Sequence, residues 1–272
     1  MRHAQRLVSG VVLLGGLVSG ASWAQTAPAG VPVSVYAAGS LREAFTEIAT
    51  AYEARTGTRI ALTFGASGLL RERIEQGEGA QVFASADTQH PQRLASSGAW
   101  QAPQVFVRNA LCALTAPGLV ATPQTLLDAM LRPGVRLGTS TPGSDPSGDY
   151  AWALFRRADV LQPGAFAALD AKALQLTGAA TSPKPPPGQG TYAWVMASGQ
   201  ADIFLTYCTN AVAAQREVPA LGVVAVVPEL SVAAAYGLTV RRGASAEATA
   251  FAQSLLAAPA QQVLARLGFA AP

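Results

Sequence analysis

The sequence predicts an α/β protein in which parallel sheets carry helices on both faces. Apolar segments of strand length alternate with segments in which apolar residues recur every three or four positions. Leu41, Phe45, Ile48 and Tyr52 show this helical spacing, and Gly57 follows as a stop. Half of the residues are hydrophobic, which is enough for large buried cores. The expected strands are residues 33–38, 59–64, 81–85, 104–115, 135–139, 202–207, 222–227 and 234–240. The expected helices are residues 41–56, 69–76, 122–132, 147–159, 192–198, 210–216, 245–257 and 260–267.

The N-terminus has the three parts of a secretory signal peptide, which we place at residues 1–24. Arg2, His3 and Arg6 precede a short apolar run, and Ser22 and Ala24 put small residues before a cleavage site. A membrane anchor is the alternative, but the apolar run is too short to span a bilayer comfortably. We therefore expect a protein exported to the periplasm.

The charge balance excludes a nucleic-acid-binding role. The chain has 19 Lys and Arg against 16 Asp and Glu, and two of the arginines lie in the expected signal peptide. The exported chain is thus close to neutral, and its basic residues form no runs. We expect neither a cofactor nor a bound metal cation, and we expect a monomer.

Two cysteines, Cys112 and Cys208, are present. An oxidising compartment permits a disulfide between them, which is the reading we favour. The alternative is a pair of small buried apolar side chains.

Three turns between an expected strand and an expected helix contain small or hydroxyl-bearing residues. Ser40 forms a capping-box pattern with Glu43, and Ser67 is placed to cap the next helix. Asp145 precedes Pro146 and Ser147 as an N-cap residue. Each turn alone is explained as a helix cap.

Together the three turns predict an anion site. In α/β sheets, ligands bind at the carboxyl ends of strands, where helices begin. Converging helix starts present backbone N–H groups and the positive end of the helix dipole, so they hold an oxyanion with neutral donors. Asp145 is compatible with an anion only if its carboxylate turns back onto its own helix amides.

Four blocks resemble the periplasmic molybdate-binding family of solute-binding proteins. They read VSVYAAGSLREAFTEIATAYEARTG, FGASGLLRERIEQGEGAQVFASAD, DPSGDYAWALF and ADIFLTYCTNA. The resemblance covers essentially the whole exported chain, and its first two blocks are the most diagnostic.

The resemblance implies a two-lobed periplasmic-binding-protein fold of type II with two hinge crossings. Lobe I then comprises residues 31–107 and 233–272, and lobe II residues 108–232. The implied function is that of the solute-binding component of an ABC importer. Such a protein binds molybdate or tungstate between its lobes and delivers it to a membrane permease.

The family's oxyanion contacts correspond to five positions of this sequence. Ser40 and Ser67 match donors that use both hydroxyl and amide, and Ser147 matches a backbone amide. Tyr207 matches a hydroxyl donor, and a fifth backbone contact falls near Gln189.

The sequence departs from the family in three places, which leaves another anionic solute as an alternative ligand. A proline-rich loop over residues 181–190 contains Lys184, Cys208 and Asn210 alter the fourth block, and Asp149 lies beside the third helix start.

A secreted hydrolase is the alternative from another class. The segment 65–68 lacks the last glycine of a nucleophile elbow. His90 is the one histidine after the signal peptide, and with Pro91 we expect it to be a helix-start residue in a solvent-facing turn. Lys172 and Lys184 lack a catalytic motif around them, so the residues that general base chemistry needs are nearly absent.

Overall fold

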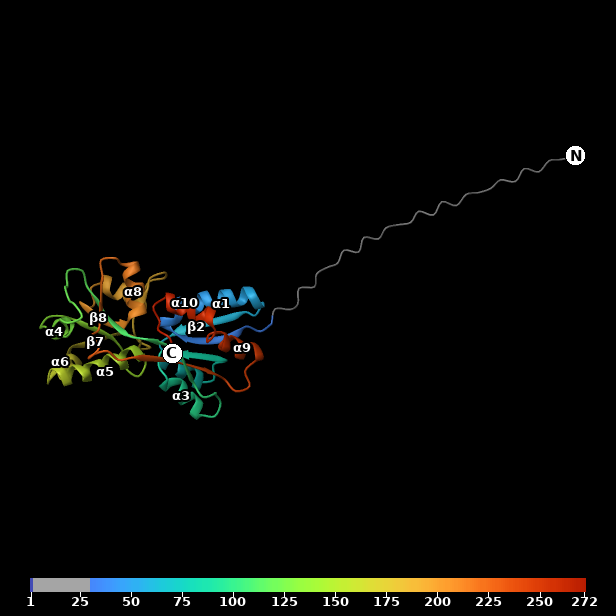
Figure 1. Cartoon of the computed structure of the whole chain (residues 1–272), viewed down its shortest axis with the longest axis horizontal. Helices are drawn as coiled ribbons and strands as arrows, with labels where there is room; N and C mark the ends of the chain where they lie inside the picture. The colour runs from blue at the N-terminus through green and yellow to red at the C-terminus, as the bar shows by residue number, and fades with distance from the viewer. Residues whose placement is uncertain (2–29) are drawn as a thin grey trace. The chain divides into compact units, whose positions relative to one another are not determined.

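The structure is a computed structural model that describes Met1 and residues 30–272. The expected signal peptide lies almost entirely outside the described residues. Within residues 31–272 the chain forms two five-stranded sheets, each with its own helices, and Figure 1 shows them as two groups of elements. This is the predicted α/β architecture with two lobes.

The first sheet belongs to lobe I and has the strand order β2-β1-β3-β10-β4. Its strands are β1 (Val33–Ala38), β2 (Ile60–Gly65), β3 (Val82–Ser85), β4 (Gln104–Asn109) and β10 (Ala234–Val240). Its helices are the 3₁₀ turn η1 (Gly39–Leu41), α1 (Arg42–Thr56), α2 (Ser67–Glu75), α3 (Gln89–Ser96), α9 (Ala246–Ser254) and α10 (Ala258–Arg266).

The second sheet belongs to lobe II and has the order β7-β6-β8-β5-β9. Its strands are β5 (Leu111–Thr115), β6 (Leu137–Ser140), β7 (Ala173–Thr177), β8 (Ile203–Tyr207) and β9 (Gly222–Ala225). Its helices are α4 (Leu126–Leu131), α5 (Pro146–Leu161), α6 (Ala165–Lys172), α7 (Thr191–Ala197) and α8 (Cys208–Glu217).

Hydrophobic periodicity explains how the elements pack. Strand β1 is almost continuously buried between two parallel neighbours, as its apolar sequence requires. Helix α1 buries Phe45, Ile48 and Tyr52, and it ends where Gly57 adopts a φ of 72°. Tyr52 meets Phe251 of α9 edge to face at 5.1 Å, which ties α1 to the C-terminal helices.

Each sheet is mixed and not purely parallel, which corrects the expectation from the sequence. Strand β10 runs antiparallel to β3 and β4, and β5 runs antiparallel to β8 and β9. Both reversed strands enter their sheet directly from a strand of the other sheet, without an intervening helix. Each reversed strand therefore starts where its neighbour in the sheet ends: Leu111, the first residue of β5, pairs with Tyr207, the last residue of β8.

The elements η1, α6 and β7 were absent from the sequence-based assignment, whereas the expected helix start at His90 and Pro91 is confirmed by α3. Helix α3 carries His90, whose side chain is only 13% exposed, so the expectation of a solvent-facing turn is wrong. The imidazole packs near Asp87, with Nε2 and Oδ2 3.9 Å apart, and burial lowers the pKa of His90. Tertiary packing buries this residue, and a local polar sequence gave no sign of it.

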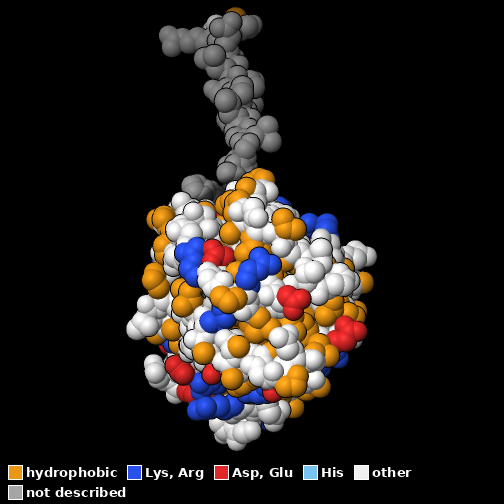
Figure 2. Space-filling model, turned by 90° about the vertical axis from the view of Figure 1, so that its left-hand side faces the viewer, with side chains coloured by type: hydrophobic (Ala, Val, Ile, Leu, Met, Phe, Trp, Pro, Cys, Tyr) orange, Lys and Arg blue, Asp and Glu red, His pale blue; other side chains and the backbone are white. Residues whose placement is uncertain are grey.

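The surface of lobe II has no dominant sign of charge on the face shown in Figure 2. Basic and acidic side chains lie there among scattered apolar ones. Among the described helices, none combines the length and the apolar character that crossing a membrane requires.

Candidate functional site

A cavity of about 520 Å³ lies between the lobes and is lined by both. Lobe I contributes the β1–α1 and β2–α2 turns, and lobe II contributes the end of β8 together with the starts of α7 and α8. The carboxyl ends of strands thus border the cavity, as expected for a ligand site in this fold.

Ser40 and Ser67 both line the cavity, and neither side chain caps a helix. Helix α1 has Leu41 as its N-cap and helix α2 has Ala66, and neither cap makes a side-chain hydrogen bond. The capping-box prediction is therefore wrong, and the prediction that Ser67 is an N-cap is also wrong.

The two serine hydroxyls have a different arrangement. The backbone N–H of Ala86 donates to Ser67 Oγ at 3.1 Å, and Ser67 is only 1% exposed. Ser40 Oγ lies 2.9 Å from the hydroxyl of Tyr236. A hydroxyl that accepts one bond still has a proton to donate, so each serine retains the means to bind an acceptor in the cavity.

Tyr207 ends strand β8 and reaches the cavity from lobe II. Its ring is 2% exposed and contacts Tyr150 and Tyr236, with ring centroids 6.2 and 5.5 Å away. Its hydroxyl donates to the carbonyl oxygen of Ala86 in lobe I at 3.3 Å. Burial raises the pKa of Tyr207 well above its usual value, so the phenol stays a neutral donor.

Ser147 lies next to the cavity but does not line it in this structure. Its backbone N–H donates to Asp145 Oδ1 at 3.0 Å, and Pro146 occupies the first turn, so the predicted Asp145 cap is confirmed. Ser147 Oγ is buried and has no hydrogen-bond partner among the described residues. The amide expected to meet the anion is therefore engaged by the cap.

Asp145 itself lines the cavity. Its carboxylate is turned onto its own helix amide, which is the arrangement that makes an aspartate compatible with a nearby anion. Burial raises the pKa of Asp145 to about 6, and the hydrogen bond from Ser147 opposes that rise only in part. The group consequently titrates close to neutral pH.

Gln189 is exposed and does not line the cavity, whereas the residues from Gly190 to Ala193 do. The backbone N–H of Gly190 donates to Glu217 Oε2 at 2.8 Å. Lys184, in the same proline-rich loop, is also exposed and away from the cavity lining. The structure thus brings together Ser40, Ser67 and Tyr207, and leaves Ser147 and Gln189 outside the lining.

Contacts between the two lobes around the cavity include three polar ones. The backbone N–H of Gly68 in α2 donates to the carbonyl oxygen of Ser144 at 2.8 Å. Arg216 of α8 forms an ion pair with Glu43 of α1 at 2.7 Å. The bond from Tyr207 to Ala86 is the third contact, so the lobes are in contact while the cavity is retained.

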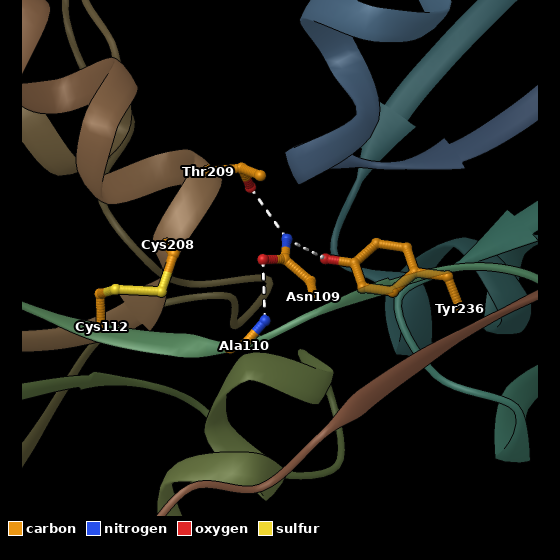
Figure 3. The surroundings of a disulfide bond; sticks show 6 residues. All are labelled: Asn109, Ala110, Cys112, Cys208, Thr209 and Tyr236. Atoms are coloured by element: carbon orange, nitrogen blue, oxygen red, sulfur yellow. Dashed lines mark hydrogen bonds between the residues drawn. A yellow bond between two sulfur atoms is a disulfide. The ribbon is translucent and has the colours of Figure 1, made fainter. Parts of the chain in front are cut away.

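A disulfide joins Cys112 in β5 to Cys208, the first residue of α8 (Figure 3). Beside it, Asn109 at the end of β4 donates to Thr209 Oγ1 at 2.9 Å and to the Tyr236 hydroxyl at 3.3 Å. Sequence reasoning identified neither Asn109 nor Tyr236 as site residues. They are 127 positions apart, and no local pattern links them.

The described residues contain no group of three or more His, Cys, Asp or Glu side chains placed to hold a metal ion. The ionisable residues that line the cavity are Arg42, Glu43, Asp145, Glu217 and two tyrosines. Glu43 and Glu217 accept from Arg216 and Gly190. Arg42 is the charged donor of the lining, and the other donors there are neutral hydroxyls and amides.

A two-lobed α/β fold with a cavity between the lobes is the architecture found in solute-binding proteins. The model of the family "Bacterial extracellular solute-binding protein" matches residues 33–270, and the chain belongs to that family.

Several known proteins and solved structures resemble this chain. An uncharacterized protein of Pasteurella multocida is 36% identical over 177 residues, 65% of this chain and 73% of its own. The molybdate-binding protein ModA of Mycobacterium tuberculosis is 31% identical over 143 residues, which are 50% of this chain and 54% of ModA. The crystal structure of the periplasmic molybdate-binding protein of Azotobacter vinelandii has a TM-score of 0.69 at 19% identity, covering 88% of this chain and 99% of that one. The match to that structure shows a shared fold.

Proposed function

We propose that this protein is the periplasmic solute-binding component of an ABC importer and binds a tetrahedral oxyanion, molybdate or tungstate, in the cavity between its lobes. The observation that carries the proposal is the hydrogen bonding of the Ser40 and Ser67 hydroxyls. Both hydroxyls lie at helix starts and border the cavity. Ser67 accepts from the Ala86 amide and Ser40 pairs with the Tyr236 hydroxyl, so each hydroxyl can direct its proton to a solute. Neutral donors of this kind hold an anion without a fixed counter-charge.

Tyr207 completes the proposed contacts from the opposite lobe. A phenol donates one hydrogen bond and carries no charge. Its present acceptor, the carbonyl oxygen of Ala86, is 3.3 Å away, so this bond is long and is readily exchanged for one to an anion. We propose that Ser147 and the region of Gln189 contribute backbone amides after a small rearrangement of the α5 and α7 starts.

We propose that lobe I spans residues 31–107 and 233–272, and that lobe II spans residues 108–232. What supports this division is the sheet membership of the strands: β4 and β10 pair in one sheet, and β5 and β9 pair in the other. Residues 1–24 serve as the signal peptide, and the exported monomer delivers its solute to a membrane permease. Its role is binding and not catalysis.

A small organic anion is the second candidate solute, and the size of the cavity favours it. About 520 Å³ remains although the lobes already touch, which is within the range of about 300–1,000 Å³ typical of sites for small organic ligands. The Arg42 guanidinium at the cavity wall lies 4.5 Å from the centre of the Phe64 ring and is available to a second anionic group.

A thermal-shift screen tests the proposal with molybdate, tungstate, sulfate, phosphate and small organic acids. A solute that binds only the folded state raises the melting temperature by mass action. We expect a shift with molybdate or tungstate that Ser67→Ala reduces strongly. The control Ser96→Ala, at an exposed helix serine that bonds only the Gln92 carbonyl, should leave the shift unchanged. A larger shift with an organic acid than with any inorganic oxyanion would replace the first candidate by the second.

A further inference from the structure

The side chain of Asn109 has a defined orientation, because its carbonyl and its amide have distinguishable partners. The backbone N–H of Ala110 donates to Asn109 Oδ1 at 2.9 Å (Figure 3). The NH₂ group therefore faces Thr209 Oγ1 and the hydroxyl of Tyr236. An amide NH₂ only donates, so the oxygen of Tyr236 accepts from Asn109.

Acceptance from Asn109 fixes the direction of the next hydrogen bond. Tyr236 is fully buried, and the described hydrogen bonds of its hydroxyl go to Asn109 and Ser40 alone. A buried hydroxyl proton needs an acceptor, and Ser40 Oγ, at 2.9 Å, is the partner that can accept it. Tyr236 thus donates to Ser40.

Ser40 is then left with its own proton, and the cavity is on its open side. Ser67 has the same arrangement, because the Ala86 amide donates to it from the protein interior. Both serines are therefore donors toward the cavity. A solute oxygen that meets them has to be an acceptor, as an ionised oxyanion is.

We propose that Asn109 and Tyr236 are positioning residues that hold the Ser40 hydroxyl as a donor directed at the solute. The chain of bonds runs from Asn109 through Tyr236 to Ser40. It begins at the crossing between β4 and β5, so it connects the hinge to the solute site. This inference rests on the proposed binding of an oxyanion next to Ser40.

The chain of bonds is also anchored to lobe II. Thr209, the second acceptor of Asn109, follows Cys208 directly, and the disulfide to Cys112 fixes the start of α8 against β5. The NH₂ group of Asn109 thus donates to one residue of each lobe. A change in lobe orientation shifts Asn109. Because Asn109 donates to Tyr236, the shift also changes the direction of the Ser40 proton.

A double-mutant cycle tests the inference by calorimetric titration with molybdate and tungstate. The variants are Tyr236→Phe, Ser40→Ala and the two combined. If Tyr236 acts through Ser40, each single variant lowers affinity by about tenfold, the loss of roughly one hydrogen bond to a charged group. The double variant then binds no worse than Ser40→Ala alone.

Tyr52→Phe is the matched control, since Tyr52 is buried in lobe I against Phe251 and away from the cavity. It should leave affinity unchanged. Asn109→Asp can replace Tyr236→Phe in the same double-mutant cycle. It replaces the donor to Tyr236 by an acceptor, so the phenol proton turns away from Ser40. Its loss of affinity should also vanish in the Ser40→Ala background.

The possible failures are distinguishable. If the wild-type protein binds neither anion, the proposed function is overturned. If wild-type binds but the losses from Tyr236→Phe and Ser40→Ala multiply in the double variant, the positioning role is overturned while the proposed function stands. Should Tyr236→Phe fail to fold, the Asn109→Asp and Ser40→Ala cycle gives the same decision.

Discussion

Replacement of Gly68 by alanine is expected to separate solute binding from folding. A Cβ at Gly68 would lie 2.4 Å from the carbonyl oxygen of Gly143, 2.7 Å from that of Ser144 and 2.9 Å from Ser144 Cα. All three atoms are backbone atoms of lobe II, so no flexible side chain can yield. The lobes have to move apart, and the bond from the Gly68 amide to Ser144 is lost.

The magnitude follows from these contacts. The lost hydrogen bond contributes about 0.5–1.5 kcal/mol. The steric contact weakens the Arg216–Glu43 and Tyr207–Ala86 contacts as well, so the total should exceed about 1.4 kcal/mol, a tenfold loss of affinity. Lobe I itself should not suffer, because alanine favours a helix over glycine by up to about 1 kcal/mol.

Calorimetric titration and thermal melting measure the two effects on the same protein. We expect Gly68→Ala to bind the oxyanion at least tenfold more weakly, because binding needs the lobes together. The melting temperature without solute should change less, because the lobes can part there without unfolding. Gly79→Ala is the control, since its Cβ would meet nothing within 4 Å. Wild-type affinity in Gly68→Ala would refute the reasoning. A loss of solute-free folding stability as large as the loss of binding free energy would refute it as well.

Three further predictions concern single groups in or beside the cavity. A bound anion should raise the pKa of Asp145 further above about 6, so affinity should fall as the pH rises from 6 to 8. The full decrease is about tenfold for each unit by which the anion raises that pKa. Asp145→Asn should abolish the pH dependence, and an equal pH profile in the variant contradicts the prediction. Replacing Cys112 and Cys208 by alanine removes a disulfide between residues 96 positions apart and should lower the free energy of unfolding by about 2–4 kcal/mol. Two free thiols titrated in the unfolded, unreduced wild type would show that the disulfide is absent. Tyr207→Phe should weaken anion binding by about 1.5–3 kcal/mol and change solute-free stability much less, whereas calorimetry showing unchanged affinity would remove Tyr207 from the site.

The sequence predicted the elements whose signals are local. The spacing of Phe45, Ile48 and Tyr52 identified α1, and Asp145 with Pro146 marked the start of α5, because capping depends on neighbours in the chain. The reversed direction of β5 and β10 had no local signal. It follows from the two crossings between the sheets, which only the assembled topology reveals.

The site shows the same division between local and tertiary information. Ser40 and Ser67 were identified from their turns, yet their hydrogen-bond partners, Tyr236 and Ala86, come from other strands. The capping predictions failed because each helix begins one residue away from the position that the pattern favoured. Asn109 was missed because a lone asparagine between two strands is common, and its role depends on a partner 127 positions later.

The central claim is tested most directly by calorimetric titration of the protein without residues 1–24, the proposed signal peptide, after refolding to remove any co-purified solute. Molybdate, tungstate, sulfate and hydrogen phosphate are compared at pH 7, with Ser67→Ala and Ser96→Ala measured in parallel. The account predicts one-to-one binding of molybdate or tungstate that is far tighter than binding of sulfate. Ser67→Ala should lose this affinity and Ser96→Ala should keep it. Equal affinities for all four anions, or no heat of binding with any of them, would contradict it.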